Sequence, residues 1–113
     1  MVSDCIFCRI AAHELPSSVV FEDQDTLAID DLNPVAPVHV LVIPRLHTKS
    51  ARELEDQRLL GALLHAAHEV ARLKGVDESG YRLIFNVGDD GGQTVHHTHL
   101  HVLGGRRLGW PPG

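Results

Sequence analysis

The spacing of apolar residues changes twice along this chain, from a strand-like to a helix-like pattern and back. This change limits the folds that the chain can adopt. From about Glu53 to Lys74, apolar residues recur at intervals of three and four, which is typical of one face of an amphipathic helix. Gly75 is well placed to end that helix. The predicted apolar face consists of Leu60, Leu63, Leu64, Ala67, Val70 and Ala71.

Strand-like segments lie on both sides of the predicted helix. The stretch from Val38 to Ile43 is rich in β-branched residues and stops at Pro44, which makes it the clearest strand candidate. The other predicted strands cover residues 18–21, 26–30, 81–87 and the histidine-rich run 96–103. Strands, one long helix and then more strands predict an α+β fold with a largely antiparallel sheet.

The composition places the chain among globular proteins and narrows its partners. It has 113 residues, of which 43% are hydrophobic and 22% charged, and no internal repeat or linker divides it, so we expect one domain over residues 1–113. The formal net charge of −5 argues against a general nucleic-acid or acidic-membrane binder, since both need a basic face. A single nucleotide is still an acceptable ligand, because backbone amides and imidazoles suffice to bind it.

The sequence carries no visible membrane span or secretion signal. No stretch approaches the roughly 20 apolar residues of a transmembrane helix, and the segment from Met1 to Cys5 has neither a basic start nor an apolar run. We therefore expect a cytoplasmic protein, in which a cysteine pair stays reduced.

The strongest functional signal is the run His96-His97-Thr98-His99-Leu100-His101-Val102-Leu103. On a β-strand successive side chains point to opposite faces, so His97, His99 and His101 would share one face. Residues two apart on a strand are separated by roughly 6–7 Å. The sequence therefore predicts three imidazoles in a row on one side of the sheet.

Three interpretations of that face are open from the residues alone. In the first, the face is simply solvated, although solvated faces normally carry Thr, Lys, Glu and Ser. Two imidazoles at positions i and i+2 can also converge on one metal ion. In the third interpretation one ring attacks or transfers a proton while the others orient it, and a second histidine protonates the leaving group. An unperturbed imidazole pKa of about 6.5 allows neutral and protonated rings to coexist near neutral pH.

The segment from His97 to Leu103 resembles the histidine-triad signature, in which three histidines alternate with apolar residues; Thr98 departs from it at the first apolar position. Residues 37–44, 91–95 and the tail 104–113 extend the resemblance to the Hint branch of the histidine-triad (HIT) superfamily. This implies one HIT domain with a five-stranded antiparallel sheet, one long helix and a short N-terminal helix. It also implies a homodimer whose sheet continues across both subunits.

The resemblance assigns catalytic roles to five residues. His99 resembles the nucleophile that attacks the α-phosphorus, and His101 resembles the histidine that contacts the phosphate. His97 and His39 resemble supporting histidines that set proton positions. Thr94 stands where the family usually has Ser and keeps a hydroxyl for the phosphate. No cofactor is expected for catalysis.

The resemblance also implies a purine-nucleotide site. Asp31 resembles the carboxylate that grips the ribose hydroxyls, although the chemistry of the adjacent Asp30 is the same. Glycines without side chains let backbone N–H groups approach phosphate oxygens. The remaining contacts implied for the nucleotide are Leu32, Asn86, Gly92, Gln93, Thr94, His99, His101, Phe7, Ile10, Leu15 and Ile29.

Cys5-Ile6-Phe7-Cys8 is a C-x-x-C motif, which is a moderate signal for zinc or redox chemistry. By resemblance to some bacterial histidine-triad proteins, Cys5, Cys8, His47 and His97 are the candidate ligands of a structural zinc ion. The alternative is a pair of buried reduced thiols. His97 is thus assigned both to the zinc site and to the catalytic site.

The resemblance implies hydrolysis of the P–N bond of adenosine or guanosine 5′-phosphoramidates. A dinucleoside polyphosphate hydrolase of the related Fhit branch is one alternative, but the tail 104–113 favours Hint. A nucleotide-binding regulator with little turnover is the other alternative. In Hint dimers the tail reaches toward the partner's active site, which is the role expected for Trp110. We expect His13, His65, His68 and His96 to lie on the surface.

Overall fold

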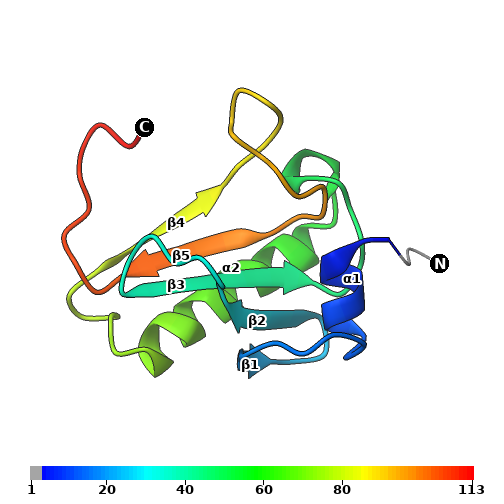
Figure 1. Cartoon of the computed structure of the whole chain (residues 1–113), viewed down its shortest axis with the longest axis horizontal. Coiled ribbons are helices and arrows are strands. Elements are labelled where there is room, and N and C mark those ends of the chain that lie inside the picture. Colours follow the sequence, from blue (N-terminus) through cyan, green and yellow to red (C-terminus); the bar gives the residue numbers. More distant parts are fainter. Residues whose placement is uncertain (1–3) are drawn as a thin grey trace.

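The structure, a computed structural model, describes residues 4–113. Two helices, one short 3-10 turn and five strands follow one another along the chain (Figure 1). In order they are α1 (Ile6–Ala11), β1 (Val19–Glu22), β2 (Thr26–Asp30), β3 (Val38–Pro44), η1 (Ala51–Glu53), α2 (Gln57–Leu73), β4 (Tyr81–Phe85) and β5 (Leu100–Gly104).

The five strands form one sheet in the order β1-β2-β3-β5-β4, and every neighbouring pair is antiparallel. β5 therefore lies between β3 and β4, with His101 opposite Leu41 on one side and Ile84 on the other. The predicted α+β class with a five-stranded antiparallel sheet is confirmed. β4 lies at one edge of the sheet and β1 at the other.

Helix α2 covers one face of the sheet and forms the main core with it (Figure 1). Asp56 caps its N-terminus by accepting hydrogen bonds from the backbone N–H groups of Arg58 and Leu59. Gly75, with a φ of 73°, allows the chain to turn away after the helix. From β5, Leu100 and Val102 point into this core, together with strand and helix residues Ala28, Val40, Val42, Leu54, Leu59, Leu63, Ala66, Ala67 and Val70.

The predicted helix was wrong at its start and on part of its face. The helix begins at Gln57 rather than Glu53, because the separate turn η1 and then Asp56 precede it. Leu64 is 43% exposed, whereas Leu59 and Ala66, which were not predicted, are buried. Contact with β1, β2, β3 and β5 buries a stripe that includes Leu59, Leu63 and Ala66.

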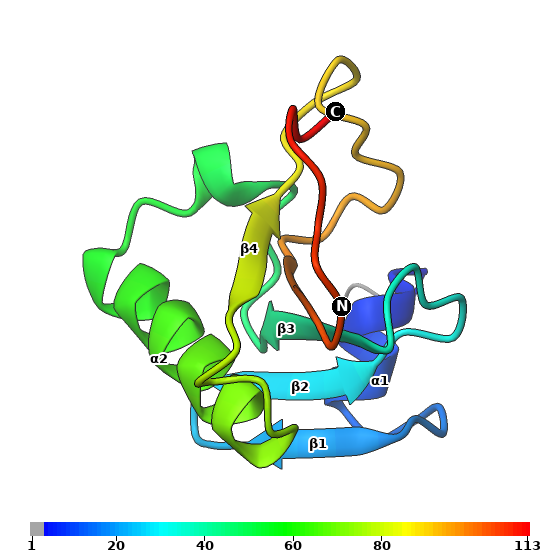
Figure 2. The same cartoon turned by 90° about the vertical axis from the view of Figure 1, so that its left-hand side faces the viewer.

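Helix α1 packs on the opposite face, over β2 and β3 only. Phe7, Ile10 and Ala11 meet Leu27, Ile29, Leu41 and Ile43 there in a second, smaller core. This helix leaves the β5 and β4 side of the same face uncovered. The C-terminal tail lies on that side of β4, opposite α2 (Figure 2).

Strand β5 begins at Leu100, so the prediction of one strand from His96 was wrong. The ladder with β3 ends where Val42 pairs with Leu100, two residues before β3 itself ends at Pro44. The Thr98 N–H instead donates to the Thr48 carbonyl at 2.8 Å. Only His101 of the predicted triad therefore lies within a strand. β4 likewise ends at Phe85 rather than at residue 87.

None of the helices that the structure describes has the length and apolar character needed to span a membrane.

Leu63 and Leu64 provide a direct test of the observed core. Leu63→Ala should lower the free energy of unfolding by about 2–5 kcal/mol, because its side chain is fully buried against the sheet. Leu64→Ala, the matched control, should cost less than about 1 kcal/mol. Urea denaturation followed by circular dichroism measures both, and equal losses would contradict the orientation of α2.

Candidate active site

A cavity of about 340 Å³ opens between α1, β2, β3 and the segment before β5. This volume lies in the range of small-molecule sites. Among the predicted site residues, those that line it are Phe7, Ile10, Ile29, Asp31, Leu32, Thr94, His99 and His101. Apolar side chains and His99 thus face the same space as the Asp31 carboxylate.

The proton position on His99 follows from its backbone partner. His99 Nδ1 lies 2.7 Å from the carbonyl oxygen of His97. A carbonyl oxygen can only accept, so Nδ1 carries the proton and donates it. Nε2 of the neutral ring is therefore left with a free lone pair, and the ring lines the cavity, packed edge-on against Phe7. That is the state required of an imidazole nucleophile.

His39 and His101 form a second imidazole pair. His39 Nδ1 accepts the backbone N–H of Val35 at 3.1 Å, so its proton lies on Nε2. That nitrogen is 2.9 Å from His101 Nδ1 and 3.3 Å from Asp31 Oδ2. When His39 donates to His101, the proton of His101 lies on Nε2. This nitrogen is buried and has no hydrogen-bond partner among the described residues.

Burial keeps this histidine pair neutral. Burial, together with the neighbouring His99 and His39, lowers the pKa of His101 to about 4. Burial also lowers the pKa of His39, against the opposing effect of the Asp31 carboxylate. The site therefore holds a neutral His101 imidazole rather than an imidazolium at neutral pH.

The structure separates the two adjacent aspartates. Asp30 turns toward the α2 side, where Lys74 Nζ at 2.9 Å and the Ser18 hydroxyl at 2.8 Å bind its carboxylate. Asp31 stands at the cavity beside His39. The residue predicted to meet the ribose is thus the one with its carboxylate beside His39.

Four predicted nucleotide contacts lie outside the cavity lining: Leu15, Asn86, Gly92 and Gln93. Leu15 packs on the smaller core instead. The cavity has further walls that sequence reasoning missed, namely Ile6, Pro16, Ser17, Ser18, Asp30, Asn33, Leu41 and Val95. Leu41 was accessible to prediction, since it lies two residues from His39 on one strand face. The loop residues carry no comparable periodic signal.

Gln93 braces the glycine-rich loop from inside the protein. Its amide Nε2 donates to the carbonyls of Lys49 and Val95, at 2.6 and 3.0 Å, and its Oε1 accepts from the Gly88 N–H. Gly91 is required for close approach, because a Cβ there would lie 2.5 Å from the Val87 carbonyl oxygen. These contacts hold the loop that leads to Thr94 and the histidines.

Thr98, the departure from the triad signature, is buried and has a polar partner. Its hydroxyl donates to the Thr48 carbonyl at 3.2 Å and accepts from the Thr48 hydroxyl at 2.6 Å. The pair satisfies a polar group where an apolar residue was expected. It also ties the segment before β5 to the loop after β3.

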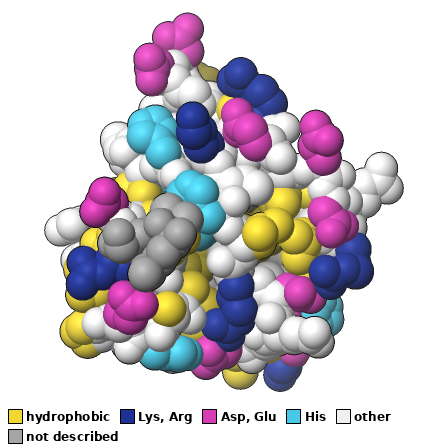
Figure 3. Space-filling view, turned by 90° about the vertical axis from the view of Figure 1, so that its right-hand side faces the viewer, with side chains coloured by type: hydrophobic (Ala, Val, Ile, Leu, Met, Phe, Trp, Pro, Cys, Tyr) yellow, Lys and Arg dark blue, Asp and Glu magenta, His cyan; other side chains and the backbone are white. Residues whose placement is uncertain are grey.

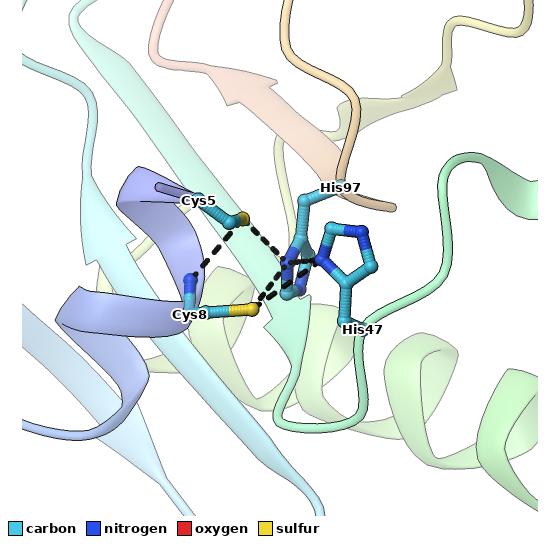
Figure 4. A group of neighbouring side chains, drawn as sticks. All are labelled: Cys5, Cys8, His47 and His97. Atoms are coloured by element: carbon cyan, nitrogen blue, oxygen red, sulfur yellow. Dashed lines mark hydrogen bonds between the residues drawn. The ribbon is translucent and has the colours of Figure 1, made fainter. Parts of the chain in front are cut away.

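The structure brings the four predicted metal ligands together (Figure 4). Cys5 and Cys8 come from the start of α1 and its first turn, His47 from the loop after β3 and His97 from the segment before β5. Their ligand atoms all lie within 4.8 Å of one another. The Cys5 and Cys8 sulfurs are 3.2 and 3.5 Å from His97 Nδ1, and His47 Nδ1 is 3.0 Å from it.

The ring orientation of His97 fits a metal ligand. Its Nε2 donates to the Pro44 carbonyl at 3.0 Å, which leaves the Nδ1 lone pair directed at the two sulfurs. Metal-bound histidines commonly donate their second N–H to a carbonyl in this way. Two thiols and two imidazoles are also a donor set suited to tetrahedral zinc. Without a metal, burial together with neighbouring Cys5 raises the pKa of Cys8 to about 11.

A second cluster of potential ligands consists of Asp31, His39 and His101, but its ring orientations do not suit a metal. Its ligand atoms are also within 4.8 Å of one another. However, the His39 Nδ1 that accepts from Val35 has its lone pair occupied, so Nε2 carries the proton and has no lone pair for a metal. This cluster is therefore a hydrogen-bonded relay.

His97 serves both sites through different atoms. Its imidazole belongs to the cysteine cluster, whereas its carbonyl oxygen sets the proton on His99. The two assignments made from the sequence are thus compatible.

The remaining histidines lie outside both clusters and are exposed, as predicted. His13 pairs with Glu22, and His68 makes a short hydrogen bond to the Tyr81 hydroxyl, a partner that was not predicted. On the face that carries α1, histidines reach the surface among acidic and basic side chains (Figure 3).

The neutral state of His101 predicts a pH-dependent stability. As the pH falls from 6.5 toward 4, His101 takes up a proton in the unfolded chain but not in the folded one. The free energy of unfolding therefore decreases over this pH range. In urea titrations between pH 7 and 4.5, His101→Gln should lose less stability than the wild type, by about 1–3 kcal/mol. An identical pH dependence of both proteins would contradict the assignment.

Comparisons with known proteins agree with this geometry. A HIT-like protein of Synechocystis sp. is 50% identical over 115 aligned positions, covering 100% of both chains. The crystal structure of a HIT family hydrolase from Legionella pneumophila Philadelphia 1 superposes with a TM-score of 0.93 at 49% identity, covering 96% of this chain and 99% of that one. A histidine triad nucleotide-binding protein from Candida albicans has a TM-score of 0.83 at 31% identity, covering 95% and 82%.

The family model described as HIT domain matches residues 12–108, which include β1 to β5 and all three histidines of the triad. With this match and these relatives, the chain belongs to the HIT domain family.

Proposed function

We propose that this protein is a Hint-type hydrolase that cleaves the P–N bond of purine nucleoside 5′-phosphoramidates. The products are the nucleoside monophosphate and an amine. The observation that carries the proposal is the free Nε2 lone pair of His99 beside the neutral donor His101, at the end of a cavity that also holds Asp31. In this assignment the purine meets Phe7, Ile10 and Ile29, and the ribose meets Asp31.

The reaction proceeds in two displacements at phosphorus. His99 Nε2 donates its electron pair to phosphorus, the P–N bond breaks, and the leaving nitrogen departs as the amine with a proton from the medium. Water then attacks the nucleotidyl-imidazole, the P–Nε2 bond breaks, and one proton returns to the medium. Throughout, the His101 Nε2–H and the Thr94 hydroxyl donate to phosphate oxygens, and the His97 carbonyl holds the His99 Nδ1–H.

A neutral ring is the appropriate nucleophile for this centre. The phosphate oxygens repel an anionic attacker, and a neutral imidazole avoids that repulsion. The relatives' own descriptions support the two broad parts of the proposal, since the Legionella protein is called a hydrolase and the Candida protein nucleotide-binding. The tail 104–113 supports the Hint branch.

One assay tests the substrate class. The purified protein should hydrolyse adenosine 5′-phosphoramidate in EDTA much faster than diadenosine polyphosphate. Preference for the dinucleotide would favour an Fhit-type hydrolase instead. AMP binding without turnover of any phosphoramidate would favour a nucleotide-binding regulator.

His99→Ala should lose several orders of magnitude in kcat with the fold intact, because it removes the attacking lone pair. The matched control is His96→Ala, which changes the exposed histidine of the same segment and should keep kcat within about twofold. Retention of more than about a tenth of wild-type kcat by His99→Ala, only ~1.4 kcal/mol of barrier, would contradict the nucleophile assignment.

We further propose that the cysteine cluster binds a structural zinc ion, which would tie α1 to the loop after β3 and to the segment before β5. Metal analysis of protein purified without chelator should find close to one zinc per chain, and Cys5→Ser/Cys8→Ser should lose it together with thermal stability. Less than about 0.1 zinc per wild-type chain would contradict the site. Reduced zinc thiolates suit the cytoplasm, where we place the protein.

A homodimer through β4 completes the proposal. β4 is an edge strand of five half-buried residues, Tyr81–Phe85, and an edge with free backbone groups is suited to pair with a second copy. Trp110, 83% exposed in the tail beside this edge, would then reach the partner. Sedimentation should give twice the monomer mass, and Leu83→Pro, which disrupts this edge, should give the monomer.

A further inference from the structure

The His39 ring has one proton and two acceptors that compete for it. Because Nδ1 accepts from Val35, the proton lies on Nε2. Nε2 faces the uncharged Nδ1 of His101 at 2.9 Å and the carboxylate Oδ2 of Asp31 at 3.3 Å. The imidazole is nearer, but hydrogen bonds to a carboxylate are roughly twice as strong as neutral ones. The two acceptors are therefore closely balanced.

The two oxygens of Asp31 are not equivalent. Oδ1 accepts the backbone N–H of Asn33 at 2.8 Å, whereas Oδ2 faces His39. The backbone fixes this arrangement, because the Asp31 N–H donates to the His39 carbonyl at 2.9 Å and places the two residues side by side. The Asp31 side chain is 20% exposed and lines the cavity. A ligand in the cavity therefore reaches the oxygen on which His39 depends.

We propose that Asp31 couples recognition of the ribose to the position of the proton on His101. The inference rests on the proposed function, because it requires a nucleotide in the cavity. A ribose hydroxyl that donates to Oδ2 offsets the negative charge that competes for the His39 N–H. That N–H is then committed to His101 Nδ1, and the proton of His101 is held on Nε2, the nitrogen available to a phosphate oxygen.

The coupling matters because the other His101 tautomer is unproductive. With its proton on Nδ1, His101 would present an Nε2 lone pair to a negatively charged phosphate oxygen. Nε2 is buried and makes no hydrogen bond to any described residue, so this difference acts in a site with little water to screen it. Loss of a ribose hydroxyl should therefore reduce kcat as well as binding.

The test compares kcat and KM for adenosine 5′-phosphoramidate and its 2′-deoxy and 3′-deoxy analogues in the wild type and in Asp31→Ala. In the wild type, at least one deoxy analogue should lower kcat about tenfold or more. In Asp31→Ala the competing carboxylate is gone, so KM should rise for the riboside but kcat should no longer depend on the sugar. The variant should then have a higher kcat than the wild type on that deoxy analogue.

Asp25→Asn is the matched control, because Asp25 pairs with Arg58 and lies outside the cavity lining. It should keep the wild-type ratio of riboside to deoxyriboside kcat. Asp31→Asn keeps the shape of the side chain and removes its charge, so it should also lose the sugar dependence if Asp31→Ala folds poorly. A deoxy effect confined to KM, or one that persists in kcat in both Asp31 variants, would overturn the proposal.

A spectroscopic measurement separates this proposal from the proposed function. In protein labelled with ¹⁵N-histidine, AMP should shift His101 toward the form with a protonated Nε2 and an unprotonated Nδ1, whereas the deoxy-AMP should do so less. Identical imidazole spectra with both nucleotides would overturn the coupling. Failure of the wild type to hydrolyse any phosphoramidate would contradict the proposed function alone, and the spectra would still decide the coupling.

Discussion

Backbone groups determine which ring nitrogen carries the proton in His97, His99 and His39, and the chemistry of the site depends on this constraint. The His97 carbonyl fixes the proton of His99 on Nδ1, and the Pro44 carbonyl fixes that of His97 on Nε2. The Val35 N–H fixes the proton of His39 on Nε2. Each of these groups lies at or beyond the end of a strand: Pro44 is the last residue of β3, His97 precedes β5, and Val35 lies in the loop before β3. The free backbone groups at strand ends are thus used to orient imidazoles.

This constraint also separates the two sites that five histidines form. In His97 and in His99, one ring nitrogen donates its proton to a backbone carbonyl. The other nitrogen therefore keeps a lone pair for a metal or a phosphorus. In His39, Nδ1 accepts a backbone N–H, so Nε2 carries the proton and donates it within the relay. Distances alone do not make this distinction, since both clusters have ligand atoms within 4.8 Å of one another.

The sequence was sufficient to predict the α+β class, the five-stranded antiparallel sheet and the cavity positions of His99, His101 and Asp31. Periodicity carried the fold predictions because each element buries one face, whereas the positions of His99, His101 and Asp31 at a nucleotide site were implied by the resemblance to the HIT family. It failed where chain geometry rather than burial decides: before β5 the chain bonds to the loop after β3, through Thr98 and Thr48, rather than to β3 itself. The buried face of α2 is also rotated relative to the leucine pattern. The cavity wall from Pro16 to Ser18 lies in a loop, where side-chain direction follows no period.

The most direct test of the account is to locate the covalent intermediate. Wild-type protein mixed with adenosine 5′-phosphoramidate, quenched within the first turnover at alkaline pH and digested, should yield a peptide carrying adenylate on His99 by mass spectrometry. His99→Gly should yield no adenylated peptide. Adenylate on His101 or another residue, or single-turnover hydrolysis by the wild type without any adduct in a quench that preserves phosphohistidine, would contradict the assignment of His99 as the nucleophile.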